Sequence, residues 1–173
     1  MIFSIRKAVS ADTNQILNII RAKAEFDGCA DTLRAKENDI KEAFFSPVPK
    51  AYALVVVEAD KVIGIATYYS IYSTFIAKPG IWLDDLFIYP QYRSKGIGEA
   101  LLSALCTIAE ETGCGRIDWI VAHDNQQGKR FYENVGAVIF ESVRHARLDE
   151  TAIKHLADKS LSKVTHAATR ASE

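Results

Sequence analysis

A basic turn that contains two glycines, Arg93-Ser-Lys-Gly-Ile-Gly98, is the segment best suited to bind an anion. It follows an apolar strand predicted over 81–88, which ends before Pro90 because proline has no amide for a β-ladder. A helix is predicted directly after the turn, since apolar residues recur at helical spacing from Ile97 onward. The first amides of a helix lack carbonyl partners, and glycines let an anion approach the backbone closely. The pattern therefore predicts a phosphate-binding turn.

Two other phosphate-binding patterns fit this turn poorly. A dinucleotide fingerprint has a third glycine and lies early in its domain. A Walker loop has Gly-Lys-Ser/Thr after four intervening residues, and the chain contains no such sequence. An ordinary strand-to-helix turn, in which the glycines serve geometry alone, stays open. Arg93 and Lys95 add positive charge at the rim, which favours the anion site.

The elements that must position this turn predict a mixed α+β fold. Ala59 and Asp60 are predicted to join two strands as a hairpin, and Gly64 indicates a bulge or a close backbone approach. The order β-α-α-β-β-β-α-β-α-β predicts a sheet flanked by helices, not a repeat or a bundle. Strands are predicted over 3–8, 51–58, 61–72, 81–88, 115–121 and 137–143, helices over about 16–24, 36–45, 97–111 and 126–134, and strand or helix over 147–156.

Three further segments, taken with the turn, resemble one known family in order and spacing. They are Ile63-Gly-Ile-Ala-Thr-Tyr-Tyr69, Leu83-Asp-Asp-Leu-Phe-Ile88 and Phe131-Tyr-Glu-Asn-Val-Gly-Ala137. The chain resembles the GNAT N-acetyltransferases, and among them the diamine (spermidine/spermine-type) branch, over roughly residues 5–157. The resemblance implies an acyl-CoA N-acyltransferase fold, with a central, mostly antiparallel sheet whose fourth and fifth strands splay apart. It also implies a single domain over 1–158, followed by a polar tail over 159–173 that we expect to fray.

The resemblance implies acetyl-CoA as the co-substrate. Its pyrophosphate is expected on the glycine turn, and its pantetheine arm is expected to pair with the central strand like an added strand. Asn125 is expected to hold the cofactor backbone, although a plain helix N-cap would explain it equally well. Lys129 and Arg130 can reach the adenosine phosphates or lie on a solvated helix face. The residues expected to bind the cofactor are Leu86, Phe87, Ile88, Arg93, Ser94, Lys95, Gly96, Ile97, Gly98, Asn125 and Lys129.

Acetyl transfer to an amine requires a neutral, positioned amine, a stabilised oxyanion and a proton for the leaving thiolate. The resemblance implies that Tyr132 is the general acid, with an aromatic residue packed under the sheet as the plain alternative. In the diamine branch that the chain resembles, the residue at the position of Asp84 is a glutamate that accepts the amine proton. The shorter side chain of Asp84 favours a bridging water or an electrostatic role. Attack is expected within a ternary complex, because no cysteine or serine lies in a nucleophile context.

The amine acceptor is expected beside two neighbouring acids. Asp84 and Asp85 are predicted to lie on opposite faces of their strand, so that only one faces the acceptor. The plain alternative for Asp85 is a carboxylate that braces the sheet or a loop, paired with arginine or lysine. Tyr69, and Asp27 in the polar loop over 25–32, are expected by resemblance to line the acceptor pocket. This loop is only modestly acidic, so a polyamine, a smaller amine, an amino acid and a peptide N-terminus all stay open.

Composition excludes several classes of partner. The 173 residues are 49% hydrophobic and 25% charged, which is typical of a globular domain, and the net charge of −1 argues against nucleic acid. Because no apolar run is long enough to span a membrane and no signal segment is evident, a cytoplasmic location is expected. Three cysteines and four histidines show no ligand spacing, so no metal is expected.

Three functions are compatible with these observations. The first is N-acetylation of a small primary amine such as a polyamine, a diamine or an amino acid. The second is a non-catalytic module that senses acetyl-CoA, since a fold does not fix a function. The third is transfer to a protein N-terminus or lysine. The presence of both Tyr132 and Asp84 favours an enzyme, and the resemblance implies a homodimer.

Overall fold

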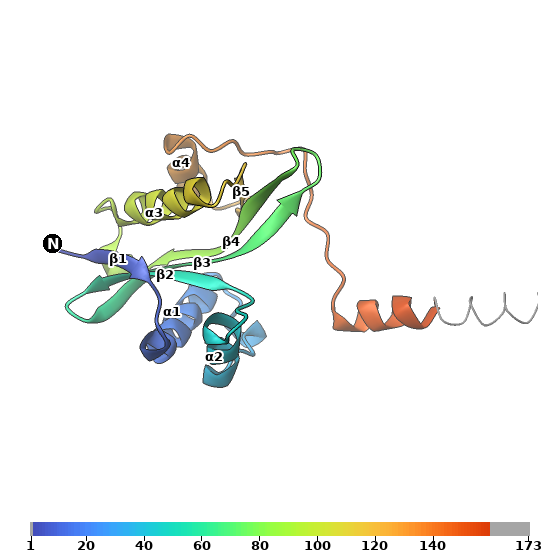
Figure 1. Ribbon diagram of the computed structural model, residues 1–173, viewed down its shortest axis with the longest axis horizontal. Coiled ribbons are helices and arrows are strands. Elements are labelled where there is room, and N and C mark those ends of the chain that lie inside the picture. The colour runs from blue at the N-terminus through green and yellow to red at the C-terminus, as the bar shows by residue number, and fades with distance from the viewer. Residues whose placement is uncertain (1, 160–173) are drawn as a thin grey trace, which may run out of the picture. The chain divides into compact units, whose positions relative to one another are not determined.

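The computed structural model describes residues 2–159. The chain divides into two compact units, Met1–Phe131 and Tyr132–Glu173. The first unit contains a five-stranded sheet in the order β1-β2-β3-β4-β5 (Figure 1). Its strands are β1 (Ser4–Lys7), β2 (Tyr52–Glu58), β3 (Lys61–Ser73), β4 (Lys78–Ile88) and β5 (Ile117–Asp118). Neighbouring strands are antiparallel except for β4 and β5, which are parallel, so the predicted mixed sheet is confirmed.

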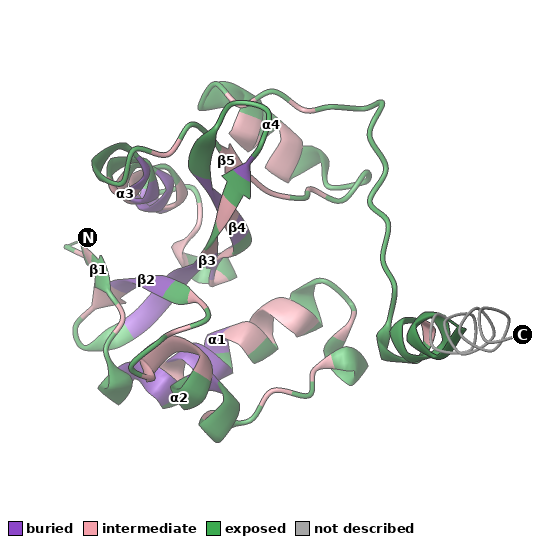
Figure 2. Ribbon diagram, turned by 45° about the vertical axis from the view of Figure 1, so that its right-hand side comes forward, coloured by how far each residue is buried: buried purple, intermediate pink, exposed green. Residues whose placement is uncertain are grey.

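Helices cover both faces of this sheet. They are α1 (Thr13–Phe26), α2 (Glu37–Phe45) and α3 (Ile97–Glu111). A further helix, α4 (Gln126–Asn134), begins in the first unit and ends in the second. In Figure 1, α1 and α2 lie below the sheet and α3 lies above it. Figure 2 shows that the buried residues follow the central strands and the sheet-facing sides of α1 and α3. We call the two sides of the sheet the α1 face and the α3 face.

Each face has its own apolar core. The core of the α1 face contains Ile16, Leu17, Ile19, Ile40, Ala53, Val55, Val62, Ile65 and Phe87. The core of the α3 face contains Leu54, Val56, Ile63, Ala66, Tyr68, Ile81, Leu83, Ile88, Ile97, Leu101, Leu102, Leu105 and Ala109. Alternation along β2 and β3 sends successive side chains to opposite cores, which explains why both strands are almost continuously apolar.

The hairpin between β2 and β3 agrees with its prediction. Ala59 and Asp60 have φ of 45° and 64°, the left-handed conformation that tight hairpin turns use. Gly64 also fulfils both predicted roles. The β2–β3 register shifts beside it, and a Cβ at this position would collide with the Ile88 side chain and lie 3.3 Å from the Phe87 carbonyl oxygen.

The later part of the chain departs from prediction in two places. The strand expected over 115–121 shrinks to β5, and the strand expected over 137–143 is absent from the described residues. A β-rich sequence becomes a strand only when a neighbouring strand pairs with it, and no strand among the described residues forms a ladder with 137–143. The segment expected as strand or helix is a helix over 150–159, with the Ala152 amide donating to the Asp149 carboxylate at 2.8 Å. Residues 160–173 of the predicted tail lie outside the described residues.

Candidate functional site

The glycine turn forms an exposed, uncapped helix start. A short 3-10 turn over Pro90–Tyr92 leads from β4 into the turn, and α3 begins at Ile97. Gly96 is the N-cap residue, has φ of 76°, and would have open space around a Cβ. With no side chain at the N-cap, the first amides of α3 and the positive end of its dipole are available to an anion. The geometry is suited to a phosphate.

Arg93 does not extend from this turn toward solvent. Its Nε donates to the Ile88 carbonyl at 2.8 Å, and its guanidinium lies 4.2 Å from the centre of the Phe26 ring and 5.2 Å from that of Phe87. Burial lowers the pKa of the Arg93 guanidinium from its usual value, and the charge of Asp27 partly offsets this effect. In this conformation Arg93 braces the end of β4 against the end of α1, while the Lys95 ammonium donates to the Gln91 carbonyl at 3.2 Å.

The splay expected between the fourth and fifth strands is present. β4 pairs with β3 along its length, but β5 supplies partners only for Ile81 and Trp82. In the described part of the chain, no strand is paired with Leu86, Phe87 and Ile88 on the β5 side. The side chains of Phe87 and Ile88 are buried in the two cores, so only their backbone can serve a ligand. An extended ligand could pair with this edge.

A β-bulge in β4 lies immediately before that edge. Leu83 is paired with Tyr68 and Asp85 with Thr67, which leaves Asp84 with no residue opposite it on β3. The contacts on either side agree with a bulge. Trp82 stacks on Tyr69 at 6.4 Å on the α1 face, and Phe87 lies in the core of that same face. Strict alternation would place residues 82 and 87 on opposite faces, so the pleat is interrupted between them.

The bulge interrupts the alternation from which the faces of the two acids were predicted. The Asp85 carboxylate accepts a hydrogen bond from the Thr67 hydroxyl at 2.9 Å and lies 3.3 Å from the Lys23 ammonium of α1. Asp84 is exposed. Burial raises the pKa of the Tyr69 phenol, and the negative charge of Asp84 raises it further. The prediction that the two acids lie on opposite faces assumed a regular pleat, and the bulge between Leu83 and Asp85 removes that premise. The alternative in which Asp85 pairs with a lysine agrees with the structure.

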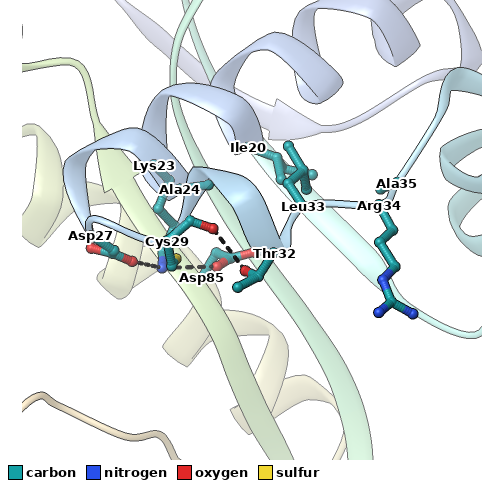
Figure 3. Close-up of a pocket in the computed structure, with 10 residues that line it drawn as sticks. All are labelled: Ile20, Lys23, Ala24, Asp27, Cys29, Thr32, Leu33, Arg34, Ala35 and Asp85. Atoms are coloured by element: carbon teal, nitrogen blue, oxygen red, sulfur yellow. Dashed lines mark hydrogen bonds and ion pairs between the residues drawn. The ribbon is translucent and has the colours of Figure 1, made fainter. Parts of the chain in front are cut away.

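A pocket of about 350 Å³ opens between α1, the loop that follows it and β4 (Figure 3). Two of the predicted acceptor residues, Asp27 and Asp85, line it. The Lys23 ammonium is paired with both of them. Burial lowers the pKa of the Lys23 ammonium. The hydrogen bond and charge of Asp27 and the charge of Asp85 raise it by more, so the pKa of Lys23 lies above its usual value. The complete lining is Ile20, Lys23, Ala24, Asp27, Cys29, Thr32, Leu33, Arg34, Ala35 and Asp85.

Sequence reasoning missed Lys23, although two signals were present. It follows Ile16 and Ile20 on the apolar stripe of α1, where a charged residue is unexpected. It also precedes Asp27 by four residues, the spacing of an ion pair on one helix face. Tyr69 and Asp84 are not among the residues that line this pocket.

The residues predicted on and before α4 lie in both units. The Gly128 amide donates to the Asn125 side-chain oxygen at 2.8 Å, which is the N-cap role left open for Asn125. The Phe131 ring of α4 lies 3.4 Å from where a Cβ would stand on Gly98, so this residue packs beside the glycine turn. Lys129 is half-buried. Tyr132 is the first residue of the second unit, and its general-acid role stays a prediction.

Within residues 2–159, no three side chains of histidine, cysteine, aspartate or glutamate gather in a group that could hold a metal ion. None of the helices in that same range has the length and the apolar character that crossing a bilayer requires.

Comparison with known proteins identifies the family. Residues 14–137 match the model of the acetyltransferase (GNAT) family. The thialysine N-epsilon-acetyltransferase of Sus scrofa is 28% identical over 166 residues, which are 90% of this chain and 97% of that enzyme. The L-ornithine N5-acetyltransferase of Arabidopsis thaliana is 38% identical over 93 residues, which are 54% of this chain and 41% of that enzyme.

A solved structure gives the same result for the fold. An integron cassette protein from the mobile metagenome of V. cholerae superimposes with a TM-score of 0.76 and 26% identity, covering 91% of this chain and 98% of the other. The enzyme from Sus scrofa supports the similarity to the diamine acetyltransferase branch. Because the family model spans well over half of the chain, this chain belongs to the GNAT acetyltransferase family.

Proposed function

We propose that this protein is an acetyl-CoA-dependent N-acetyltransferase that acts on the primary amine of a small molecule. The observation that carries the proposal is the composition of β4. Its bulge presents two acids, and the strand edge beyond the bulge has no partner in the described β5. Because a strand rises about 3.3 Å per residue, the acids and this edge lie within roughly 10 Å of each other. An amine held by the acids would therefore lie near a thioester held along the edge.

The residues of the turn fit the co-substrate. Gly96 leaves open space where a side chain would stand, and the first amides of α3 follow it directly. Ser94, Lys95, Ile97 and Gly98 complete the segment proposed to hold the pyrophosphate, with Leu86–Ile88, Asn125 and Lys129 along the rest of the cofactor. Arg93 is proposed to support the turn from behind, since its guanidinium is tied to Ile88 and two aromatic rings. When bound, acetyl-CoA supplies the activated acetyl group.

The proposed chemistry uses two residues of the chain. A free amine with a pKa near 10 is mostly protonated at neutral pH, so it must lose a proton before it attacks. Asp84 accepts this proton, directly or through a water molecule, and its exposed position on the bulge leaves room for that water. Tyr132 donates its phenolic proton to the departing thiolate as the carbon–sulfur bond breaks. The amine attacks directly within the ternary complex.

The proposed acceptor is a diamine or an amino acid with a side-chain amine. The names of the two relatives, for thialysine and for ornithine, support this class. Asp27, Tyr69 and Asp85 are proposed to contact the acceptor together with Asp84. Asp27 and Asp85 line one pocket, and Tyr69 lies on the same face of the sheet.

The test is thiol release from acetyl-CoA in the presence of a panel of amines. The panel contains ornithine, lysine, thialysine, putrescine, spermidine, an aminoglycoside and a peptide with a free N-terminus. Turnover on one of the small amines supports the proposal. Tight binding of acetyl-CoA without turnover on any of them would replace it with a sensing module, and turnover on the peptide alone would replace it with a protein acetyltransferase.

We also propose, from the family resemblance, a homodimer in the cytoplasm. Light scattering coupled to size-exclusion chromatography tests the first part. A mass near that of one 173-residue chain at all concentrations would refute the dimer. Fractionation of cells that express the protein tests the second part.

A further inference from the structure

We infer that Lys23 determines acceptor specificity by acting as a tethered cation that makes the pocket select an amine which also carries a carboxylate. This inference deepens the proposed function and rests on it. Lys23 is a residue of α1 that lies in the pocket wall, between the two acids Asp27 and Asp85.

The first step is the position of the Lys23 ammonium. It lies between two carboxylates, with hydrogen-bond contact to Asp27 and 3.3 Å to Asp85 (Figure 3). Asp85 is held further by the Thr67 hydroxyl at 2.9 Å. The Lys23 side chain is only 26% exposed, since its stem lies on the buried stripe of α1. A lysine ammonium is chemically the same group as the protonated end of a diamine, so Lys23 already occupies the place where such a cation would bind.

The second step is the charge balance of the pocket. Its lining contains two acids, Asp27 and Asp85, and two bases, Lys23 and Arg34, so two negative and two positive charges give a net charge of zero. A site that selects a polycation would be expected to have excess negative charge. Figure 3 shows Lys23 beside the acids and Arg34 toward the other end of the pocket. The pocket therefore presents both signs of charge, as a zwitterionic ligand does.

The third step is what each kind of acceptor must displace. An amino acid brings an ammonium for the carboxylates and a carboxylate for the Lys23 ammonium, so every half-buried charge keeps a partner when it binds. A diamine without a carboxylate can bind the acids only by displacing Lys23, which leaves that cation unpaired. Removing one partner of a partly buried charge pair is costly, and the cost discriminates against the diamine.

The test compares acceptors that differ only in the carboxylate. Putrescine is ornithine without its carboxylate, and cadaverine bears the same relation to lysine. The ratio of kcat/KM for ornithine over putrescine is measured in the wild type and in Lys23→Met, which keeps the apolar stem. We expect the wild type to prefer ornithine and the variant to shift the ratio toward putrescine by about tenfold or more. Lys23→Arg, which keeps the charge, is expected to retain the preference.

The matched control is Lys41→Met. Lys41 forms the same kind of four-residue ion pair, with Glu37 at 2.7 Å, but on α2 and outside the pocket. It should leave the ratio unchanged. If Lys23→Met does not fold, as judged by circular dichroism, Lys23→Gln replaces it. An unchanged ratio in the folded Lys23 variant, or a wild-type preference for putrescine over ornithine, would overturn the inference.

Calorimetric binding separates this inference from the proposed function. Ornithine and putrescine are titrated into the protein with coenzyme A present, in the wild type and in the variants. If no amine is turned over, the proposed function fails, but the ratio of the two affinities still tests Lys23. Preference for ornithine in the wild type that is lost in Lys23→Met supports the inference. Equal ratios in both proteins would refute it, and so would the absence of binding of either ligand to the wild type.

Discussion

The two ends of α3 offer a comparison that isolates the binding role of the glycine turn. Gly96 at the start of the helix and Gly113 just past its end have φ of 76° and 68°, and neither would place a Cβ within 4 Å of another atom. An alanine at either site therefore suffers the same strain of a left-handed backbone and no collision. That strain costs roughly 1–2 kcal/mol for a residue with a Cβ.

The consequence for stability should be equal in the two variants. For a domain of this size, about 1 kcal/mol lowers the melting temperature by about 2–4 °C, so Gly96→Ala and Gly113→Ala should each lower it by roughly 2–8 °C. Only Gly96→Ala should weaken acetyl-CoA, because only there does the added methyl group stand where a phosphate must approach the first amides of α3. We expect a loss of affinity of about tenfold, equivalent to about 1.4 kcal/mol.

The assay combines thermal denaturation with calorimetric titration of coenzyme A at a temperature where both variants are folded. Equal melting temperatures with a selective loss of coenzyme A affinity in Gly96→Ala would support the phosphate role of the turn. Equal affinities in the two variants would refute it, and would favour the plain interpretation in which the glycines serve the geometry of a strand-to-helix turn.

Three further predictions concern single groups. Tyr132→Phe should lower kcat by about 10²–10⁴-fold with little change in acetyl-CoA affinity, if its phenol is the general acid; unchanged turnover would contradict this. Thr67→Val should destabilise the protein by about 1.5–3 kcal/mol in urea denaturation, since the buried hydroxyl holds the charged Asp85; an unaltered midpoint would show that this bond is not needed. The hydrogen bonds from Arg6 lower the pKa of Asp12, so its share of stability is present above about pH 4 and is lost as pH falls through the folded pKa. In Asp12→Asn, the free energy of unfolding should therefore fall less steeply below about pH 4 than in the wild type. The same fall in both proteins would exclude Asp12 as its cause.

Local signals predicted the elements that position the site. The bounds of α3 and α4 agree with those expected from apolar spacing and from glycines that stop or start a helix. The two-residue hairpin at Ala59 and Asp60 was equally local. The splay of β4 from β5 was expected only through the family resemblance, since no feature of either strand alone indicates it.

The parts that could not be predicted depend on partners far away in the sequence. The run over 81–88 gives no sign of a bulge, because the bulge arises from the register with β3. The segment over 137–143 has strand composition but no strand beside it among the described residues. The ion pair between Lys23 and Asp85 joins residues 62 positions apart, and only the fold brings α1 against β4.

The bulge at Asp84 has a consequence for how this chain can vary. Beyond it, Phe87 fills the core of the α1 face, and Ile88 fills the core of the α3 face against the space left by Gly64. Asp84 is the extra residue of the bulge, so deleting it would restore the pleat and leave the residues that follow paired with β3 and on their present faces. The two cores therefore constrain neither the identity of the residue at position 84 nor its presence. The proposed proton acceptor is thus a residue that the packing on either side of the sheet does not require, so this acid can be gained or lost without disturbing the cores.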